Sequence, residues 1–351
     1  MRVAGGIANL ECRPVEPRLG SPASSVFVES ACKYGATPSA AKDRKTNPIG
    51  RAVLMFRNLA CGLCALFLIV SGRARRARRR AFNGEVITSI YFHRPNRKLF
   101  AQCISWLAKH GYTFISSDEL IKILHNGGPF PRGGAWISLD DGYRSWLVDV
   151  LPVIRQYKVP VTLFVPSGIV SGNGLFPFFH DPQYPRETRK FIQSVPKKEV
   201  IREALTIEEL KRIAAYPEVE IGGHTVSHAI TVYSTQQDLQ FEIGEDKRAI
   251  EAWTGASVKS FAYPAGYVDG RETQFLQDFG FAVAATTEPS FITRRTDPLR
   301  VPRFCVPDNV TFPEAICAMV GVWRPFIDPI KRLFGDAGGL APSPANGRNY
   351  Q

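Results

Sequence analysis

The chain has 351 residues, of which 44% are hydrophobic, so it can build a sizeable packed core in one large or two small domains. Its net charge of +12 is unevenly distributed along the chain. Residues 1–80 hold 15 basic and 4 acidic residues, whereas residues 81–351 hold 29 basic and 28 acidic residues. A near-neutral body argues against a nucleic-acid-binding protein. Seven cysteines, odd in number and scattered, argue against a secreted domain stapled by disulfides.

The N-terminal part divides into an arm and a basic apolar segment. Residues 1–54 lack helical or strand periodicity, so we expect a disordered arm, or an untranslated one if Met55 is the start. Within residues 55–80, an apolar run of about 12 residues is shorter than the roughly 20 of a membrane-spanning helix. The run is followed by "RARRARRR". We interpret residues 55–80 as a membrane-surface anchor whose arginines bind anionic head groups; a buried or disordered helix with a solvated basic face is the alternative.

The position of this charge also bears on localisation. In a cleavable signal peptide the basic residues precede the apolar run, whereas here they follow it. The positive-inside rule places such arginines on the cytoplasmic side. We therefore expect a membrane-associated protein on the cytoplasmic face rather than an exported one.

Strand and helix patterns alternate from residue 86 onward, which predicts parallel strands joined by crossover helices. About seven such units in residues 86–320 favour an α/β fold, a distorted (β/α) barrel. Residues 171–205 look like an insertion over this domain, and residues 335–351, rich in Gly, Pro and Asn, a disordered tail. The expected strands are residues 85–93, 113–116, 134–141, 159–167, 218–228, 259–266 and 281–287, with helices at 97–112, 116–124, 145–157, 206–216, 238–255 and 271–280.

Polar residues end several of the apolar runs, and in parallel barrels the working residues lie at the C-terminal ends of the strands. The runs end in His93, in Asp140 and Asp141, in His224 and His228, and in the turn after Tyr263 and Pro264. On a helical turn, His224 and His228 would face the same way, as two ligands of one metal require. With one aspartate they form a His2Asp site, although an isolated HxxxH occurs more often on a surface.

The adjacent aspartates have two interpretations. If Asp141 binds the metal, the cation offsets the repulsion and leaves Asp140 free as a base. Alternatively, the Asp-Asp-Gly turn merely caps the following helix. The two histidines favour the first interpretation.

The motifs "SLDDGYRS", "GGHTVSH" and "SFAYPAG", in this order, resemble the polysaccharide deacetylase family of carbohydrate esterases, which includes the rhizobial nodulation protein B. "IYFHRP" and "LAKHGYTFISSDEL" are similar to its first strand and helix, so the resemblance covers about residues 86–306. It implies a distorted (β/α) barrel, a NodB homology domain, that removes N-acetyl groups from amino sugars with a divalent metal.

The resemblance also implies roles for individual residues. Asp140 matches the general base; Asp141, His224 and His228 match the metal ligands. Water on the metal would be deprotonated by Asp140 and attack the amide carbonyl. The oxyanion would be held by the metal and by the backbone N–H of Ala265, after Tyr263 and Pro264.

Two departures from the family pattern concern the base and the acid. Ala262 stands where the family often has an arginine that pairs with the base, so the chain resembles the "FAYP" branch. No histidine occurs after His228, where the family usually provides its general acid. Arg303, in "LRVPRFCV", could replace the missing cation but releases no proton. His93 is the candidate acid, with a structural hydrogen-bonding role as its alternative; for Arg303 the alternative is a plain salt bridge.

The sequence thus predicts a metal-dependent hydrolase of an N-acylated sugar in a polysaccharide, oligosaccharide or glycolipid. Zinc is the first choice of metal, with cobalt, nickel or manganese as alternatives. A deformylase or deacetylase of a lipid-linked sugar precursor is a second reading. A third is a catalytically inactive barrel that binds glycans.

Overall fold

The structure is a computed structural model and describes residues 48–174, 176 and 202–333. Its centre is a parallel sheet in the order β7-β6-β5-β4-β3-β1-β8, with β2 paired to β3. Such a curled seven-strand half-barrel confirms the predicted α/β class with a distorted barrel. The strands are β1 (Thr88–Phe92), β2 (Thr113–Ile115), β3 (Gly134–Leu139), β4 (Val161–Val165), β5 (Val219–Gly223), β6 (Ser260–Ala262), β7 (Val283–Ala285) and β8 (Phe304–Cys305).

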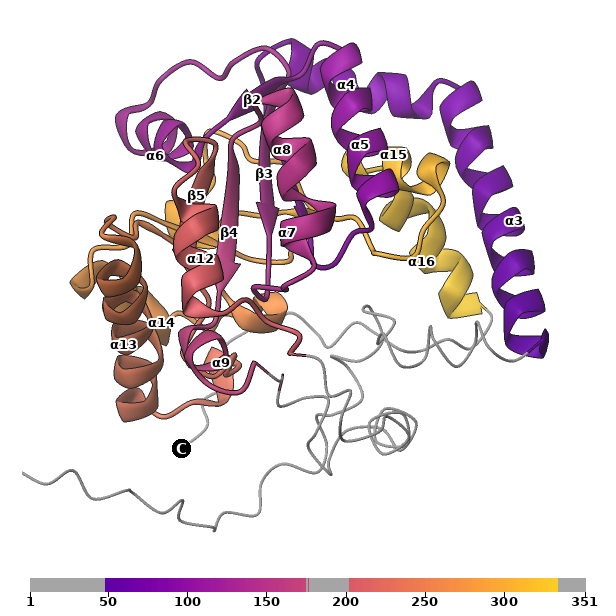
Figure 1. Cartoon of the computed structure of the whole chain (residues 1–351). Helices are drawn as coiled ribbons and strands as arrows, with labels where there is room; N and C mark the ends of the chain where they lie inside the picture. Colours follow the sequence, from indigo (N-terminus) through magenta and orange to yellow (C-terminus); the bar gives the residue numbers. More distant parts are fainter. Residues whose placement is uncertain (1–47, 175, 177–201, 334–351) are drawn as a thin grey trace, which may run out of the picture.

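Helices cover the sheet and explain its apolar strands. In Figure 1, α5, α8 and α12 lie in front of the sheet, with α13 and α14 at one end and α3, α15 and α16 at the other. A sheet buried on both faces needs continuous apolar strands, and every residue of β1, β3 and β4 is buried. The helices are α5 (Arg97–Lys109), α6 (Ser117–Asn126), α7 (Trp146–Asp149), α8 (Leu151–Tyr157), α9 (Ser167–Ser171), α12 (Ile207–Ala214), α13 (Gln236–Thr254), α14 (Arg271–Asp278), α15 (Phe312–Met319) and α16 (Trp323–Leu333).

Local sequence signals set several helix boundaries. Ser116 and Thr206 each accept a hydrogen bond from the N–H three residues later and close a capping box with Glu119 and Glu209, as their spacing predicts. One helix differs from expectation: residues 145–157 form two helices, α7 and α8, that meet at Val150. Pro152 explains the break, because its ring disfavours a continuous helix across the residues before it.

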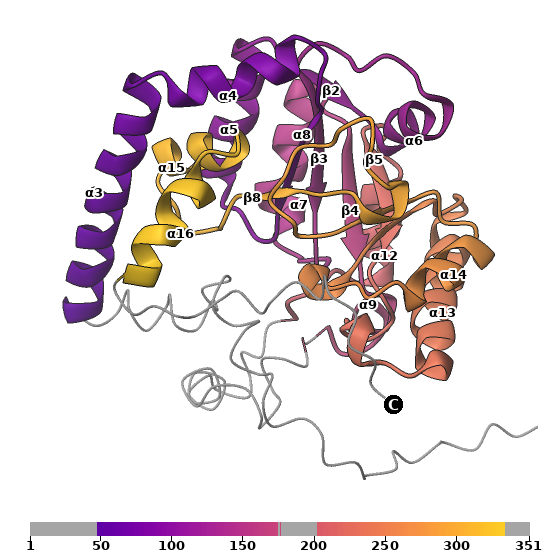
Figure 2. The ribbon, with the colours of Figure 1, turned by 180° about the vertical axis from the view of Figure 1, so that it is seen from behind.

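The N-terminal part carries two helices. α3 (Pro48–Val70) begins inside the predicted arm, so residues 48–54 are helical rather than disordered, and α4 (Arg73–Phe82) follows it. In the described part of the chain, no single helix is both long and apolar enough to cross a membrane. Met55–Val70 and α4 together pass this test by length and composition, but the two helices meet at an angle of 58°. Figure 2, the view from behind, shows α3 beside α15 and α16.

The predicted insertion falls largely outside the described residues, which resume at residue 202. Its two ends lie together, because the Glu203 N–H donates to the carbonyl of Gly174 (3.0 Å). Ala204 forms an isolated antiparallel bridge with Tyr143, two residues after Asp141. The insertion therefore leaves and rejoins the domain next to the end of β3.

Candidate active site at the strand ends

The chain turns that follow β1, β3, β5 and β6 lie at one edge of the sheet, because parallel strands end at the same edge. The arrows of β3 and β4 show this common direction in Figure 1. Asp140 and Asp141 follow β3, and His224 and His228 follow β5. β4 lies between these two strands, so the aspartates and histidines must reach across it to meet.

Asp141, His224 and His228 form one cluster. Asp141 Oδ1 lies 3.4 Å from His224 Nε2 and 3.2 Å from His228 Nε2, and the three candidate ligand atoms all lie within 4.8 Å of one another. Two ligands of a tetrahedral metal with bonds of 2.0–2.1 Å are about 3.3 Å apart. The donor types and their spacing therefore fit one small divalent metal ion.

The electrostatics of the cluster favour bound positive charge. Burial alone would raise the pKa of the Asp141 carboxyl, but hydrogen bonds from His224 and His228 and the charge of His93 hold that pKa well below its usual range. For His224, burial would lower the pKa, but the hydrogen bond to Asp141 and the charges of Asp140 and Asp141 raise it. The negative charge that favours a proton on this cluster also attracts a metal cation.

The histidine loop differs from the predicted helical turn, which was wrong. Residues 224–228 contain no helix, and Thr225 and His228 both have left-handed backbone angles (φ 63° and 61°). Two such residues turn the chain sharply after β5, so that His228 comes back beside His224, with ring centroids 4.9 Å apart. Left-handed angles are costly for non-glycine residues, so the surrounding contacts must hold this loop in place.

Two carboxylates of α13 hold the histidine loop. Asp246 accepts the backbone N–H of His224 through Oδ2 and that of Ser167 through Oδ1, both at 2.8 Å. Glu242 accepts the N–H of Ser227 (2.9 Å) and its hydroxyl (2.7 Å). Burial raises the pKa of Asp246 to about 7, against the opposing effect of its hydrogen bonds. We name Glu242 and Asp246 the α13 clamp.

The sequence analysis missed the clamp, although it has a signal. The two acids are four residues apart in the helix that follows the HxxxH motif, which places them on one helix face. A further contact orients His224, whose Nδ1 lies 2.6 Å from the carbonyl oxygen of Ala262. If Nδ1 donates there, the lone pair of Nε2 is left facing Asp141, as ligation requires.

Asp140 lies beside the cluster and pairs with Arg303. Arg303 Nη1 and Nη2 donate to the two carboxylate oxygens of Asp140, each at 2.7 Å, and its side chain is fully buried. Ser138 Oγ and the carbonyl of Thr286 accept two more of its N–H groups, both at 2.9 Å. The structure thus places a guanidinium on Asp140, where Ala262 cannot supply one.

His93 lies at the end of β1, half-buried, with its ring edge-on to Tyr91. Its carbonyl oxygen accepts the indole N–H of Trp146 (2.7 Å). Burial raises the pKa of the Asp308 carboxyl, opposed by the charge of His93 and by the Arg94 N–H, which donates to Asp308 at 2.8 Å. The charge of His93 thus acts on Asp308, another residue that the sequence analysis missed.

The "FAYP" segment forms a tight turn after β6. Ala265 has a left-handed backbone angle (φ 58°), and Thr287 donates its hydroxyl to the Ala265 carbonyl (3.1 Å). Pro264 is buried. Tyr263 is buried with its hydroxyl bonded to the Leu299 carbonyl (2.9 Å), so its side chain serves the fold.

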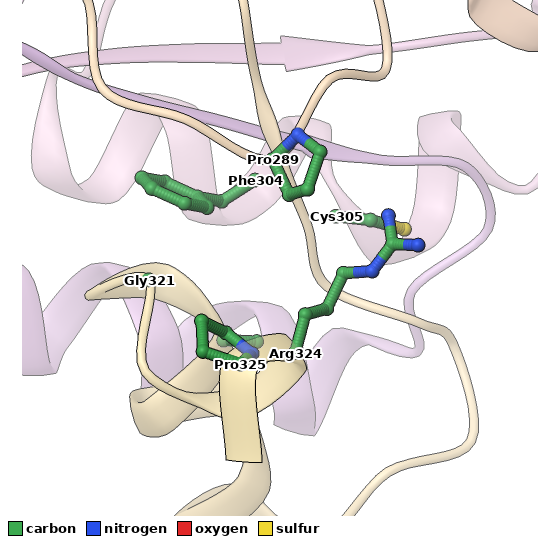
Figure 3. Close-up of a pocket in the computed structure, with 7 residues that line it drawn as sticks. Pro289, Phe304, Cys305, Gly321, Arg324 and Pro325 are labelled. Carbon is green, nitrogen blue, oxygen red and sulfur yellow. The ribbon is translucent and has the colours of Figure 1, made fainter. Parts of the chain in front are cut away.

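Figure 3 shows a small pocket lined by residues of the β8 region and of α15 and α16. One of them, Cys305, is a free thiol, and burial raises its pKa to about 12, so it is a poor nucleophile. His180, which belongs to the predicted insertion 171–205, lies outside the described residues. The labelled residues are Pro289, Phe304, Cys305, Gly321, Arg324 and Pro325.

Comparison with known proteins gives matches in sequence and in fold. The family model described as polysaccharide deacetylase matches residues 127–284. The Bacillus subtilis protein YxkH, named as a candidate polysaccharide deacetylase, is 22% identical over 201 residues, 57% of this chain and 61% of its own length. The poly-beta-1,6-N-acetyl-D-glucosamine N-deacetylase of Staphylococcus aureus is 20% identical over 216 residues, 60% of this chain and 67% of its own length. The chain thus spans about three fifths of the first relative and two thirds of the second.

Solved structures share the fold at low identity. The deacetylase PplD of Streptococcus pyogenes, solved with acetate, has a TM-score of 0.54 and 17% identity, over 67% of this chain and 98% of its own. IcaB from Ammonifex degensii has a TM-score of 0.50 and 19% identity, over 68% of this chain and 97% of its own. The family match runs through the segments that carry Asp140, His224 and Pro264, and the solved structures share the fold. Residues 127–284 of this chain therefore belong to the polysaccharide deacetylase family.

Proposed function

We propose that this chain is a metal-dependent hydrolase that removes N-acetyl groups from an amino sugar in a polysaccharide, an oligosaccharide or a glycolipid. The observation that carries the proposal is the Asp141–His224–His228 cluster beside a second, separately held carboxylate, Asp140. A divalent ion held by the three ligands supplies Lewis acidity toward the amide carbonyl and toward water. Zinc is our first choice because the ligand spacing suits tetrahedral geometry; cobalt, nickel and manganese also accept such donors.

Asp140 is the proposed general base. Its two bonds to Arg303 prevent the carboxylate from rotating, and each carboxylate oxygen keeps a further lone pair for the proton of the attacking water. The N–H of Ala265, in the turn after Pro264, is proposed to stabilise the oxyanion. His93 is proposed to protonate the leaving amine, with a structural role as its alternative.

The identity of the acyl group and of the sugar admits other candidate functions. A deformylase or deacetylase of a lipid-linked sugar precursor is the second candidate, and the basic segment 59–80 favours it, because such a substrate lies at a membrane. An inactive glycan-binding barrel is the third, supported by the absence of the family's usual histidine after His228. Against it stands the complete set of base and metal ligands.

The side of the membrane would decide between these substrates. We propose that residues 59–80 hold the protein at an anionic membrane surface on the cytoplasmic face, because the arginines follow the apolar run. A cytoplasmic enzyme would act on a precursor, and an exported one on finished polysaccharide.

The proposal is tested on the full chain as wild type, Asp141→Asn and Asp140→Asn, by metal content and by acetate release from N-acetylglucosamine oligomers. We expect about one equivalent of metal in the wild type. Asp141→Asn should lose both metal and activity, whereas Asp140→Asn should keep the metal and lose activity. Exposed Asp278 on α14, changed to Asn, serves as the matched control.

Two other outcomes would change or refute the proposed function. Metal without acetate release would move the search to formylated or lipid-linked sugars. A wild-type protein that binds no divalent metal would refute the hydrolase and leave a glycan-binding barrel.

A further inference from the structure

α3 is docked on the body through one of its faces. Ala65 and Leu68 are buried in the main core cluster, and Ala65 accepts a hydrogen bond from the Cys317 thiol of α15 (3.5 Å) through its carbonyl oxygen. Arg57 Nη2 lies 2.8 Å from Glu314, whose side chain is fully buried. Figures 1 and 2 show the helix along the side of α15 and α16. α3 is therefore part of the folded domain rather than a separate tail.

The opposite face of α3 is apolar and exposed. With about 100° between successive residues, its large side chains fall within an arc of roughly 120° and extend about 22 Å along the helix. An amphipathic helix normally turns such a stripe to the core, whereas this one turns it to solvent. A continuous exposed apolar patch marks an interaction surface. We name it the outer stripe: Met55 (73% exposed), Phe56 (74%), Leu59 (62%), Leu63 (58%), Leu66 (46%), Phe67 (60%) and Val70 (84%).

A cluster of positive charge follows the outer stripe along the chain. α4 begins three residues after Val70 and is fixed to the body by Arg78, whose guanidinium lies 5.0 Å from the ring centre of Trp106 and 5.5 Å from that of Tyr112. The other five arginines of α4 are exposed, and we name them the arginine cluster: Arg73, Arg75, Arg76, Arg79 and Arg80.

We propose that the outer stripe and the arginine cluster bind an anionic lipid bilayer, with α3 lying in the plane of the interface and the domain attached beneath it. An apolar helix face that sinks into the acyl boundary, next to guanidinium groups that reach lipid phosphates, is the pattern of an interfacial helix. The contacts with α15 and the bend of 58° before α4 favour a helix that lies on the membrane over one that crosses it.

A second copy of the chain is the competing occupant of the outer stripe. Two copies that met through this face with their α3 helices parallel would bring two arginine clusters near one another, which charge repulsion disfavours. Anionic lipid provides the opposite charge instead. This contact deepens the membrane attachment of residues 59–80 proposed above, on which it rests, and it does not depend on the hydrolase activity.

The test is flotation of the full chain with vesicles of phosphatidylglycerol and phosphatidylethanolamine, compared with phosphatidylcholine alone. We expect binding to the anionic vesicles and at least tenfold weaker binding to the neutral ones. Leu63→Glu with Phe67→Glu should weaken binding to anionic vesicles at least tenfold, because it places charge in the apolar stripe. The matched control is Phe241→Glu, which changes an exposed phenylalanine on α13.

The charge is tested by Arg75→Gln with Arg76→Gln and Arg79→Gln, which should lower binding at least tenfold and weaken its dependence on salt. The matched control is Lys211→Gln with Arg212→Gln, which changes two exposed residues on α12. It should change neither the binding to anionic vesicles nor its dependence on salt. The proposal is overturned if the wild type does not float, or if the stripe variant floats equally well. It is also overturned if the wild type is a dimer that binds neither kind of vesicle, whereas the stripe variant is a monomer. Acetate release from a soluble oligomer should stay unchanged in all these variants, so failure here is distinct from failure of the hydrolase.

Discussion

Arg303 is bonded to Asp140 more completely than a plain salt bridge requires. Four of its N–H donors are used, two of them on the carboxylate, and the rings of Tyr91 and Phe164 lie 4.3 and 5.5 Å from its guanidinium carbon. Removal of one partner from a buried ion pair leaves the other charge without compensation. The pair therefore fixes the position of the proposed base and makes the fold depend on both residues.

We expect Arg303→Ala to lower the free energy of unfolding by about 3–5 kcal/mol, measured by urea denaturation. Arg303→Lys keeps the charge but cannot form two parallel bonds, so it should lose less stability and still lower kcat on the order of a hundredfold, through a displaced base. Arg300→Lys, three residues earlier and exposed, is the control. Wild-type kcat in Arg303→Lys would argue that Arg303 only supports the fold.

His93 poses a sharper choice between chemistry and structure. If it protonates the leaving amine, His93→Gln should lower kcat about 10²- to 10⁴-fold while the metal content and the unfolding midpoint stay near wild type. If its role is structural, the midpoint should fall and kcat should follow only the folded fraction. His125→Gln, an exposed histidine bonded to the Ala282 carbonyl, is the matched control.

At the scale of elements, α13 determines the shape of the histidine loop. The α13 clamp fixes the N–H groups of His224 and Ser227, on either side of the strained residue Thr225. We expect Asp246→Asn and Glu242→Gln each to weaken zinc binding about 10- to 100-fold, because neighbours that orient ligands contribute at this level. Zinc affinity is measured by competition with a chromophoric chelator. Glu245→Gln, half-buried on the same helix, should leave the affinity unchanged. Equal affinity in all four proteins would show that the clamp does not position the ligands.

The clamp also shows where prediction from sequence stops. Strand ends could be predicted because a polar residue after an apolar run is visible locally, which located Asp140 and His224. Glu242 and Asp246 lie in a helix of mixed charge whose acids look solvated, and only the packing of α13 against the histidine loop buries them. The left-handed angle of His228 was equally invisible, since it results from contacts distant in sequence. Both failures come from tertiary interactions that override local pattern.

At the scale of the whole molecule, the site joins segments that are far apart along the chain. Asp141 follows β3 and the histidines follow β5, so a bound ion would link strands on either side of β4. Arg303, just before β8, reaches Asp140 through the pairing of β8 with β1 and of β1 with β3. Assembly of the site thus requires the paired strands of the half-barrel, and binding of a ligand at the site should stabilise the whole sheet.

The wild-type protein should therefore lose thermal stability when its metal is removed. A ligand present at a thousand times its dissociation constant stabilises the native state by about 4 kcal/mol, and each kcal/mol shifts the midpoint of such a domain by about 2–4 °C. We expect a chelator to lower the midpoint of the wild type by about 10 °C and to leave Asp141→Asn unchanged, measured by calorimetry. Asp278→Asn should respond as the wild type does. If the chelator leaves the wild type unchanged, no resident metal joins β3 to β5, and the Asp141 cluster serves the fold alone.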